Sequence, residues 1–137
     1  MRKIYLAIGV GFFLFCLAYF LVIFTPVDRV FWWYDDVMHV IGGIWAAFFS
    51  VSVFAEWSRR GFVSFQSRFV YALCIIAFVF MIGVSWEWYE FGLDEYFIFR
   101  YDHPRQQELV DTLGDLGSDS VGALVFLLIS RIRKKAP

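Results

Sequence analysis

The chain has 137 residues, of which 61% are hydrophobic and 23% aromatic. A soluble domain of this length has too small an interior to bury so much apolar surface, so the composition excludes a water-soluble globular protein and predicts that lipid acts as solvent. The formal net charge of −1 says little by itself, because the positions of the charges matter more than their sum. We expect membrane lipid as a partner and no nucleic acid.

Four apolar segments predict an all-α, four-helix transmembrane bundle. In chain order they cover about residues 4–27, 35–56, 69–91 and 109–132, and each is close to the roughly 20 residues that a helix needs to cross the hydrocarbon core. The first segment follows a basic pair, as in secretory signals, but its apolar run is too long and no small-residue cleavage site precedes Pro26, so we expect a retained anchor. Residues 1–137 are predicted to form a single domain.

The basic residues collect at one set of helix ends. Of the twelve, nine flank the predicted helices on that side, namely Arg2, Lys3, Arg59, Arg60, Arg68, Arg131, Arg133, Lys134 and Lys135. Of the thirteen acidic residues, all but Glu56 lie toward the opposite side. Because Lys and Arg are retained on the cytoplasmic side, we expect both termini in the cytoplasm and the acidic ends facing outward.

Ionisable residues inside the second and third segments lie on single helix faces. Asp35 and His39 are four positions apart and share a face, which continues through the small residues Gly42, Gly43 and Ala46 that let another helix approach closely. On the third segment, a stripe at spacings of four, three and four positions faces one direction; it consists of Gly83, Glu87, Glu90 and Asp94.

The fourth segment carries carboxylates at every fourth position, Asp111, Asp115 and Asp119. Their span corresponds to about 12 Å of axial rise, so the acids descend from the surface into the hydrocarbon zone. A charge at mid-membrane costs roughly 2.5 kcal/mol or more, so several on converging helices imply a shared purpose. The small residues of this segment are expected to keep it thin for close packing; they are Gly114, Gly117, Ser118 and Gly122.

Alternating helix directions bring the start of the second segment, the end of the third and the start of the fourth to one side of the membrane. We therefore predict an acidic cavity open to the extracytoplasmic side, formed by Asp35, His39, Glu87, Glu90, Asp111, Asp115 and Asp119. So many carboxylates need compensation by protonation, by pairing with Arg100, Arg105 or His103, or by a bound cation. Oxygen ligands with one imidazole suit Mg²⁺, Mn²⁺ or Ca²⁺, and also Zn²⁺ if His39 contributes.

Three motifs together resemble a known family. They are D-x-x-x-H at 35–39, W-E-x-x-E at 86–90, and D-T-x-x-D-x-x-x-D-x-x-G-A at 111–123. The combination resembles small membrane proteins of the YjdF-like, DUF2238 type and, more loosely, the VanZ-like family, from whose pattern Tyr89-Glu90-Phe91 and Asp119 depart. The resemblance implies a bacterial inner-membrane location and, for VanZ-like members, an association with the cell envelope and glycopeptide tolerance.

Several functional hypotheses follow from these residues. The first is a metal-dependent hydrolase or transferase acting on a lipid-phosphate or envelope precursor, in which Glu90 or Asp119 is the general base and Arg100 or Arg105 holds the phosphate. Its metal ligands would be Asp35, His39, Glu87, Asp111 and Asp115.

Two hypotheses involve no chemistry on a substrate. One is a cation-binding or transport module, and the other is a structural protein, dimeric through its glycine-rich faces. Taken singly, Asp35 also fits a helix N-cap, Asp111 a partner of the helix dipole, and His39 a hydrogen-bonded packing residue.

Overall fold

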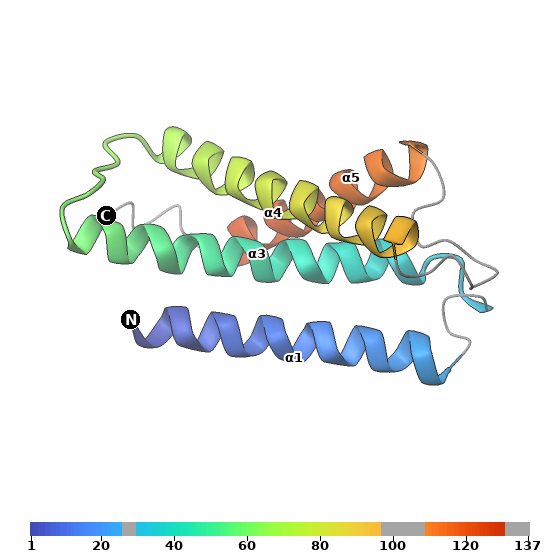
Figure 1. The fold of residues 1–137 in the computed structure, drawn as a ribbon. Helices are drawn as coiled ribbons and strands as arrows, with labels where there is room; N and C mark the ends of the chain where they lie inside the picture. Colours follow the sequence, from blue (N-terminus) through green and yellow to red (C-terminus); the bar gives the residue numbers. More distant parts are fainter. Residues whose placement is uncertain (26–29, 97–108, 131–137) are drawn as a thin grey trace.

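The protein is an all-α bundle, as predicted. The computed structural model describes residues 1–25, 30–96 and 109–130, apart from the side chains at 19, 22, 23, 94 and 96. Its helices are α1 (Arg2–Phe24), α3 (Tyr34–Arg59), α4 (Arg68–Tyr96) and α5 (Leu109–Ile129). Figure 1 shows them side by side, with the start of α3, the end of α4 and the start of α5 at the same end of the bundle.

Three of the helices are long and apolar enough to cross a membrane, namely α3, α4 and α5. Membrane crossing by α1, which has 23 residues, stays a prediction. The helix ends differ somewhat from the expected ones. α1 stops at Phe24 because Thr25 is extended, with φ −137° and ψ 153°, as steric clash favours for a residue that precedes proline. α4 continues to Tyr96, beyond the expected end near residue 91.

Small residues bring α3 and α5 into close contact. Gly43 and Ala46 of α3 and Gly122 and Ala123 of α5 are all buried. A Cβ added at Gly43 would run into the backbone of Asp119, and one added at Gly122 would run into the backbone of α3. The two helix backbones therefore touch, as small residues permit in membrane bundles, and the predicted role of the α3 face is confirmed.

The earlier glycines of α5 take no part in this contact. An added Cβ at Gly114 or Gly117 would meet nothing within 4 Å among the described residues, and both glycines are exposed. Only one face of a helix can meet a given neighbour. That face of α5 holds Gly122 together with Asp115 and Asp119, so the two earlier glycines fall outside the contact.

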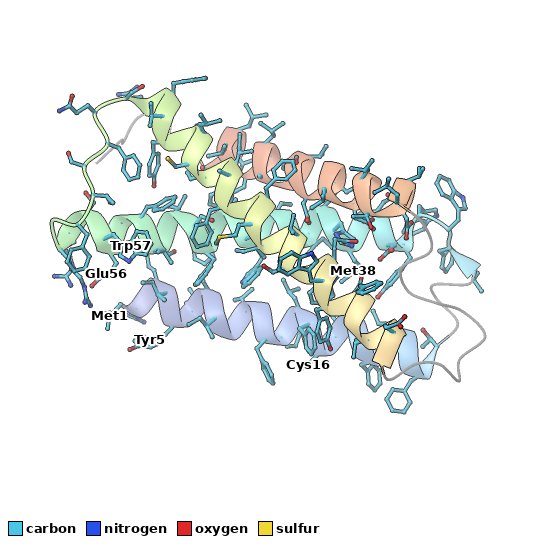
Figure 2. The ribbon with its side chains drawn as sticks, turned by 45° about the horizontal axis from the view of Figure 1, so that its top comes forward. Met1, Tyr5, Cys16, Met38, Glu56 and Trp57 are labelled. Atoms are coloured by element: carbon cyan, nitrogen blue, oxygen red, sulfur yellow. The ribbon has the colours of Figure 1, made fainter. Side chains whose placement is uncertain are left out.

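An apolar core joins α3 and α4 away from the acidic residues of the predicted cavity. Ile75 and Val79 are at most 1% exposed, and Phe54 packs edge-on against Phe65 at a ring distance of 5.5 Å. At the same end, Glu56 pairs with Arg59 at 2.6 Å and Arg60 at 2.8 Å. Figure 2 shows Met1, Glu56 and Trp57 together there. We call this the Glu56 end and the opposite one the His39 end.

Contacts between side chain and backbone attach α1 to α3. The indole Nε1 of Trp45 donates a hydrogen bond to the carbonyl oxygen of Ala7 at 2.7 Å. Gly11 faces the same indole, and a Cβ there would collide with the ring. Near the Glu56 end, the amino group of Met1 lies 3.2 Å from Glu56 Oε2. α1 is thus held along its first half.

Candidate functional site

His39 lies at the centre of the predicted acidic cluster and is 6% exposed. Its Nε2 is 3.7 Å from Asp115 Oδ1 and 4.0 Å from Asp35 Oδ1. Its other ring nitrogen, Nδ1, is 3.5 Å from Asp119 Oδ1. The imidazole therefore has carboxylates beside both nitrogens, from α3 itself and from α5.

This arrangement follows from helix periodicity and from the close approach of two backbones. Asp35 and His39 are one turn apart on α3, and Asp115 and Asp119 are one turn apart on α5. The contact at Gly43 fixes how far apart the two pairs lie, because Gly43 faces the backbone of Asp119. Asp115 and Asp119 are buried, with exposed fractions of 5% and 7%.

α4 adds two glutamates to the cluster. Glu87 is 4% exposed, and its Oε1 is buried without a hydrogen-bond partner among the described residues. A carboxylate oxygen of Glu87, one of Glu90 and a ring nitrogen of His39 all lie within 4.8 Å of one another. Ligand atoms of Asp35, His39 and Asp115 also lie within 4.8 Å of one another. His39 therefore belongs to two sets of atoms spaced as metal ligands are.

Gly83 lets Asp119 lie against α4. A Cβ at this position would collide with the Asp119 carboxylate and would come within 2.9 Å of Leu116 Cδ2. The absence of a side chain at Gly83 therefore makes room for the carboxylate that contacts His39. The sequence placed Gly83 on the acidic stripe of α4 but did not reveal this role.

The predicted site residues fall into three groups. Six of them form what we call the His39 cluster: Asp35, His39, Glu87, Glu90, Asp115 and Asp119. Asp111 is half-buried in the first turn of α5 and belongs to neither set of ligand-spaced atoms. Arg100, Arg105 and His103 lie outside the described residues. No lysine or arginine occurs in the described segments 4–25, 30–58 and 69–96 or in α5.

A cavity of about 180 Å³ adjoins the cluster. The predicted cavity was acidic, whereas this one is largely apolar, and its polar lining residues are Tyr34, Asp35, His39, Glu90 and Asp119. Its walls come from α3, α4 and α1, and α5 contributes Asp119. The part played by α1 was missed in the sequence, because α1 is apolar all round and no face is marked as facing the cavity. The α1 lining residues are Gly11, Leu14, Phe15 and Ala18.

The fold and this cluster define a class: a helical membrane protein with a buried histidine and carboxylate centre near one end of its bundle. Comparison with known families then identifies the chain. The family model described as "Predicted membrane protein (DUF2238)" matches residues 2–136, and the protein belongs to that family. The resemblance to the DUF2238 type is thereby confirmed, and the likeness to VanZ-like proteins stays a prediction. No curated protein and no solved structure matches this chain.

Proposed function

We propose that the His39 cluster binds a divalent cation. The observation that carries this proposal is Glu87, a carboxylate 4% exposed, whose Oε1 has no hydrogen-bond partner among the described residues and which lies beside His39 and Glu90. An unpaired carboxylate oxygen buried at this depth costs several kcal/mol in order of magnitude. A cation bound between the carboxylates would remove that cost and offset their mutual repulsion.

Four residues are the proposed ligands: Asp35, His39, Glu87 and Asp115. His39 would coordinate through Nε2, the nitrogen that faces Asp35 and Asp115. Its Nδ1–H would then donate to Asp119, which makes Asp119 a positioning residue that fixes the ring and its tautomer. Three carboxylates with one imidazole favour Mn²⁺ or Zn²⁺ over Ca²⁺, which takes six to eight oxygens in roughly pentagonal geometry. Mg²⁺ is the remaining alternative.

The chemistry that suits this centre is hydrolysis or transfer of a phosphoryl group on a lipid or envelope precursor. A divalent cation polarises a phosphoryl oxygen and lowers the pKa of bound water. Glu90 lines the cavity where a substrate would enter and lies within 4.8 Å of ligand atoms of His39 and Glu87. We assign it as the general base that takes the proton of the attacking water. Arg100 and Arg105 are proposed to hold the phosphate.

A transport path receives less support than a blind site. Between the cluster and the Glu56 end, the bundle is filled by Ala46, Ala47, Ile75, Val79 and Ala123, none more than 2% exposed. The buried Ser50 hydroxyl donates to the Ala46 carbonyl of its own helix at 2.6 Å, so it could offer a passing cation one oxygen. A single oxygen does not replace the several ligands that a cation needs to cross this apolar layer.

Elemental analysis of the protein purified in mild detergent without chelator tests the metal centre. We expect about one divalent metal per chain in the wild type and loss of at least about nine-tenths of it in Glu87→Gln/Asp115→Asn, because two ligands are neutralised. The matched control is Asp36→Asn/Glu95→Gln, which neutralises two exposed acids toward the same end and should keep the metal. Absence of metal in the wild type would mean that the acids are protonated or ion-paired and would overturn the proposal.

The role of Glu90 is tested separately. Glu90→Gln should retain the metal but release phosphate from phosphatidic acid or a polyprenyl phosphate at least about a hundredfold more slowly than the wild type, the scale on which a general base contributes. Equal turnover by this variant would remove Glu90 from the mechanism. Absence of turnover in the metal-loaded wild type with both lipids would instead leave a cation-binding protein without the proposed reaction.

A further inference from the structure

The lining of the cavity beside the His39 cluster extends along α3. From Asp35, a residue of the cluster, to Ala46, the lining covers about 16 Å of axial rise. This length is about half of the roughly 30 Å hydrocarbon core of a bilayer. Figure 2 places Met38, one of the lining residues, away from the end that holds Met1 and Glu56. The cavity therefore reaches from the polar cluster toward the middle of the bundle.

The two ends of the cavity differ in chemistry. The cluster end carries Asp35, His39 and Glu90, and the Asp119 carboxylate lies against Gly42 and Gly83 farther along the cavity. Beyond it, the inner end is lined by Trp45, Ala46 and Val79. The Trp45 indole nitrogen is already bonded to Ala7, so this residue presents its ring rather than a hydrogen-bond donor. A ligand that fills the cavity must be polar at one end and hydrocarbon along its length.

The size of the cavity restricts the ligand further. Pockets for drug-sized molecules measure roughly 300–1,000 Å³, whereas this one has about 180 Å³. A small volume whose lining extends over about 16 Å of α3 fits part of one chain rather than a compact ring system or a whole two-chain lipid. The chain enters from lipid, because a soluble apolar molecule of this length would partition into the bilayer first.

We propose that this cavity binds one hydrocarbon chain of a lipid phosphate, whose phosphate group lies at the His39 cluster. This inference rests on the proposed metal centre for the headgroup only. The described helices carry no lysine or arginine at the His39 end. An anionic headgroup that contacts these helices therefore needs a bound cation as its partner. Divalent cations held by carboxylates characteristically complete their coordination with substrate phosphate oxygens.

Photolabelling in nanodiscs tests the chain site. The probe is phosphatidic acid with a diazirine in one acyl chain, incorporated at low mole fraction into phosphatidylcholine discs that contain the Mn²⁺-loaded protein. A second probe is a diazirine-bearing polyprenyl phosphate, and labelling by one or the other identifies the type of chain. We expect label on the lining residues of α1 and α4, and none above background from phosphatidylcholine carrying the same diazirine chain, because its phosphate is capped.

Two pairs of variants separate the cavity from the outer surface of the same helices. Ala18→Trp and Ile82→Trp fill the cavity from α1 and α4 and should lower labelling at least about tenfold, equivalent to about 1.4 kcal/mol. Leu17→Trp and Met81→Trp add the same side chain at adjacent exposed positions that do not line the cavity, and should label like the wild type. Metal content is measured for all four, so that a variant that fails to fold is recognised by loss of the metal.

The outcomes distinguish the chain site from the metal centre. Metal-loaded Ala18→Trp and Ile82→Trp that label as strongly as their controls would overturn the chain site and leave the metal centre standing. Equal labelling by the phosphatidylcholine probe would also overturn it, because the site would then not select a phosphate monoester. A wild type without metal would overturn the metal centre, and cavity labelling in that protein would show that the chain site does not need it.

Discussion

Gly122 and Gly117 lie five positions apart on α5 but have different surroundings. An added Cβ at Gly122 runs into the backbone of α3, which cannot yield as a flexible side chain would, whereas Gly117 faces open space. Gly122→Ala should therefore lower stability by about 1–3 kcal/mol through overpacking. Gly117→Ala should be neutral or raise it by up to about 1 kcal/mol, because alanine is the better helix former. Thermal unfolding in detergent, followed by circular dichroism, compares the two, and equal midpoints would contradict the observed contact.

Gly83→Ala should affect the site more than the fold. The new methyl group would displace the Asp119 carboxylate, which is the end of a flexible side chain, and so would remove the partner of His39 Nδ1. Loss of a carboxylate that orients a metal-bound histidine lowers metal affinity by about 10–100-fold. Competition with a fluorescent chelator measures that affinity.

Gly92→Ala is the matched control for Gly83→Ala. Gly92 lies on the same helix, and an added Cβ there meets nothing within 4 Å among the described residues. Unchanged affinity in both variants would argue that Asp119 does not hold His39. An equal fall in both would indicate a general effect of alanine on α4 instead of a local one at Asp119.

At the scale of elements, the indole hydrogen bond of Trp45 helps to fix the registry of α1 against α3. Trp45→Phe removes the bond to the Ala7 carbonyl and should cost about 0.5–1.5 kcal/mol. Hydrogen exchange should then accelerate in α1 around Ala7 and Gly11 but not in α5, since the affected bond joins only α1 and α3.

Trp88→Phe provides the comparison for Trp45→Phe, because Trp88 is 75% exposed on α4. It should leave exchange in α1 unchanged. Acceleration in α1 of equal size in both variants would contradict the role given to Trp45. The same registry positions Gly11 and Ala18 along the cavity, so loosening α1 should also weaken labelling by the lipid probe.

Sequence periodicity predicted the helices better than their partners. The spacings of Asp35 with His39 and of Asp115 with Asp119 are local, and each helix presents them on one face. The lateral position of α1 has no such local signal, since most of its residues are apolar and every face suits lipid. The structure alone assigns the Gly11 and Ala18 face to the cavity.

At the scale of the whole molecule, the distribution of charge predicts the orientation in the membrane. Exposed Thr25 follows α1 toward the His39 end, and exposed Ser64 lies between α3 and α4. In a Cys16→Ala/Cys74→Ala background, Thr25→Cys should react with a membrane-impermeant maleimide in intact cells. Ser64→Cys should react only after permeabilisation, because the positive-inside rule places its basic neighbours Arg59, Arg60 and Arg68 in the cytoplasm. The reverse pattern would invert the predicted orientation and turn the cluster toward the cytoplasm.

The sequence by itself determined the apolar helices, the family and the end of the bundle where the acids gather, because hydropathy, spacing and motif are properties of neighbouring residues. Only the tertiary structure decided which of them meet. It brought Asp119 beside His39 and left Asp111 outside both groups of atoms that are spaced as metal ligands are. It made Gly122, rather than Gly114 or Gly117, the contact with α3. It also gave the cavity an apolar wall from α1. These choices depend on how each helix is rotated and shifted against its neighbours, which close packing fixes and local sequence does not encode.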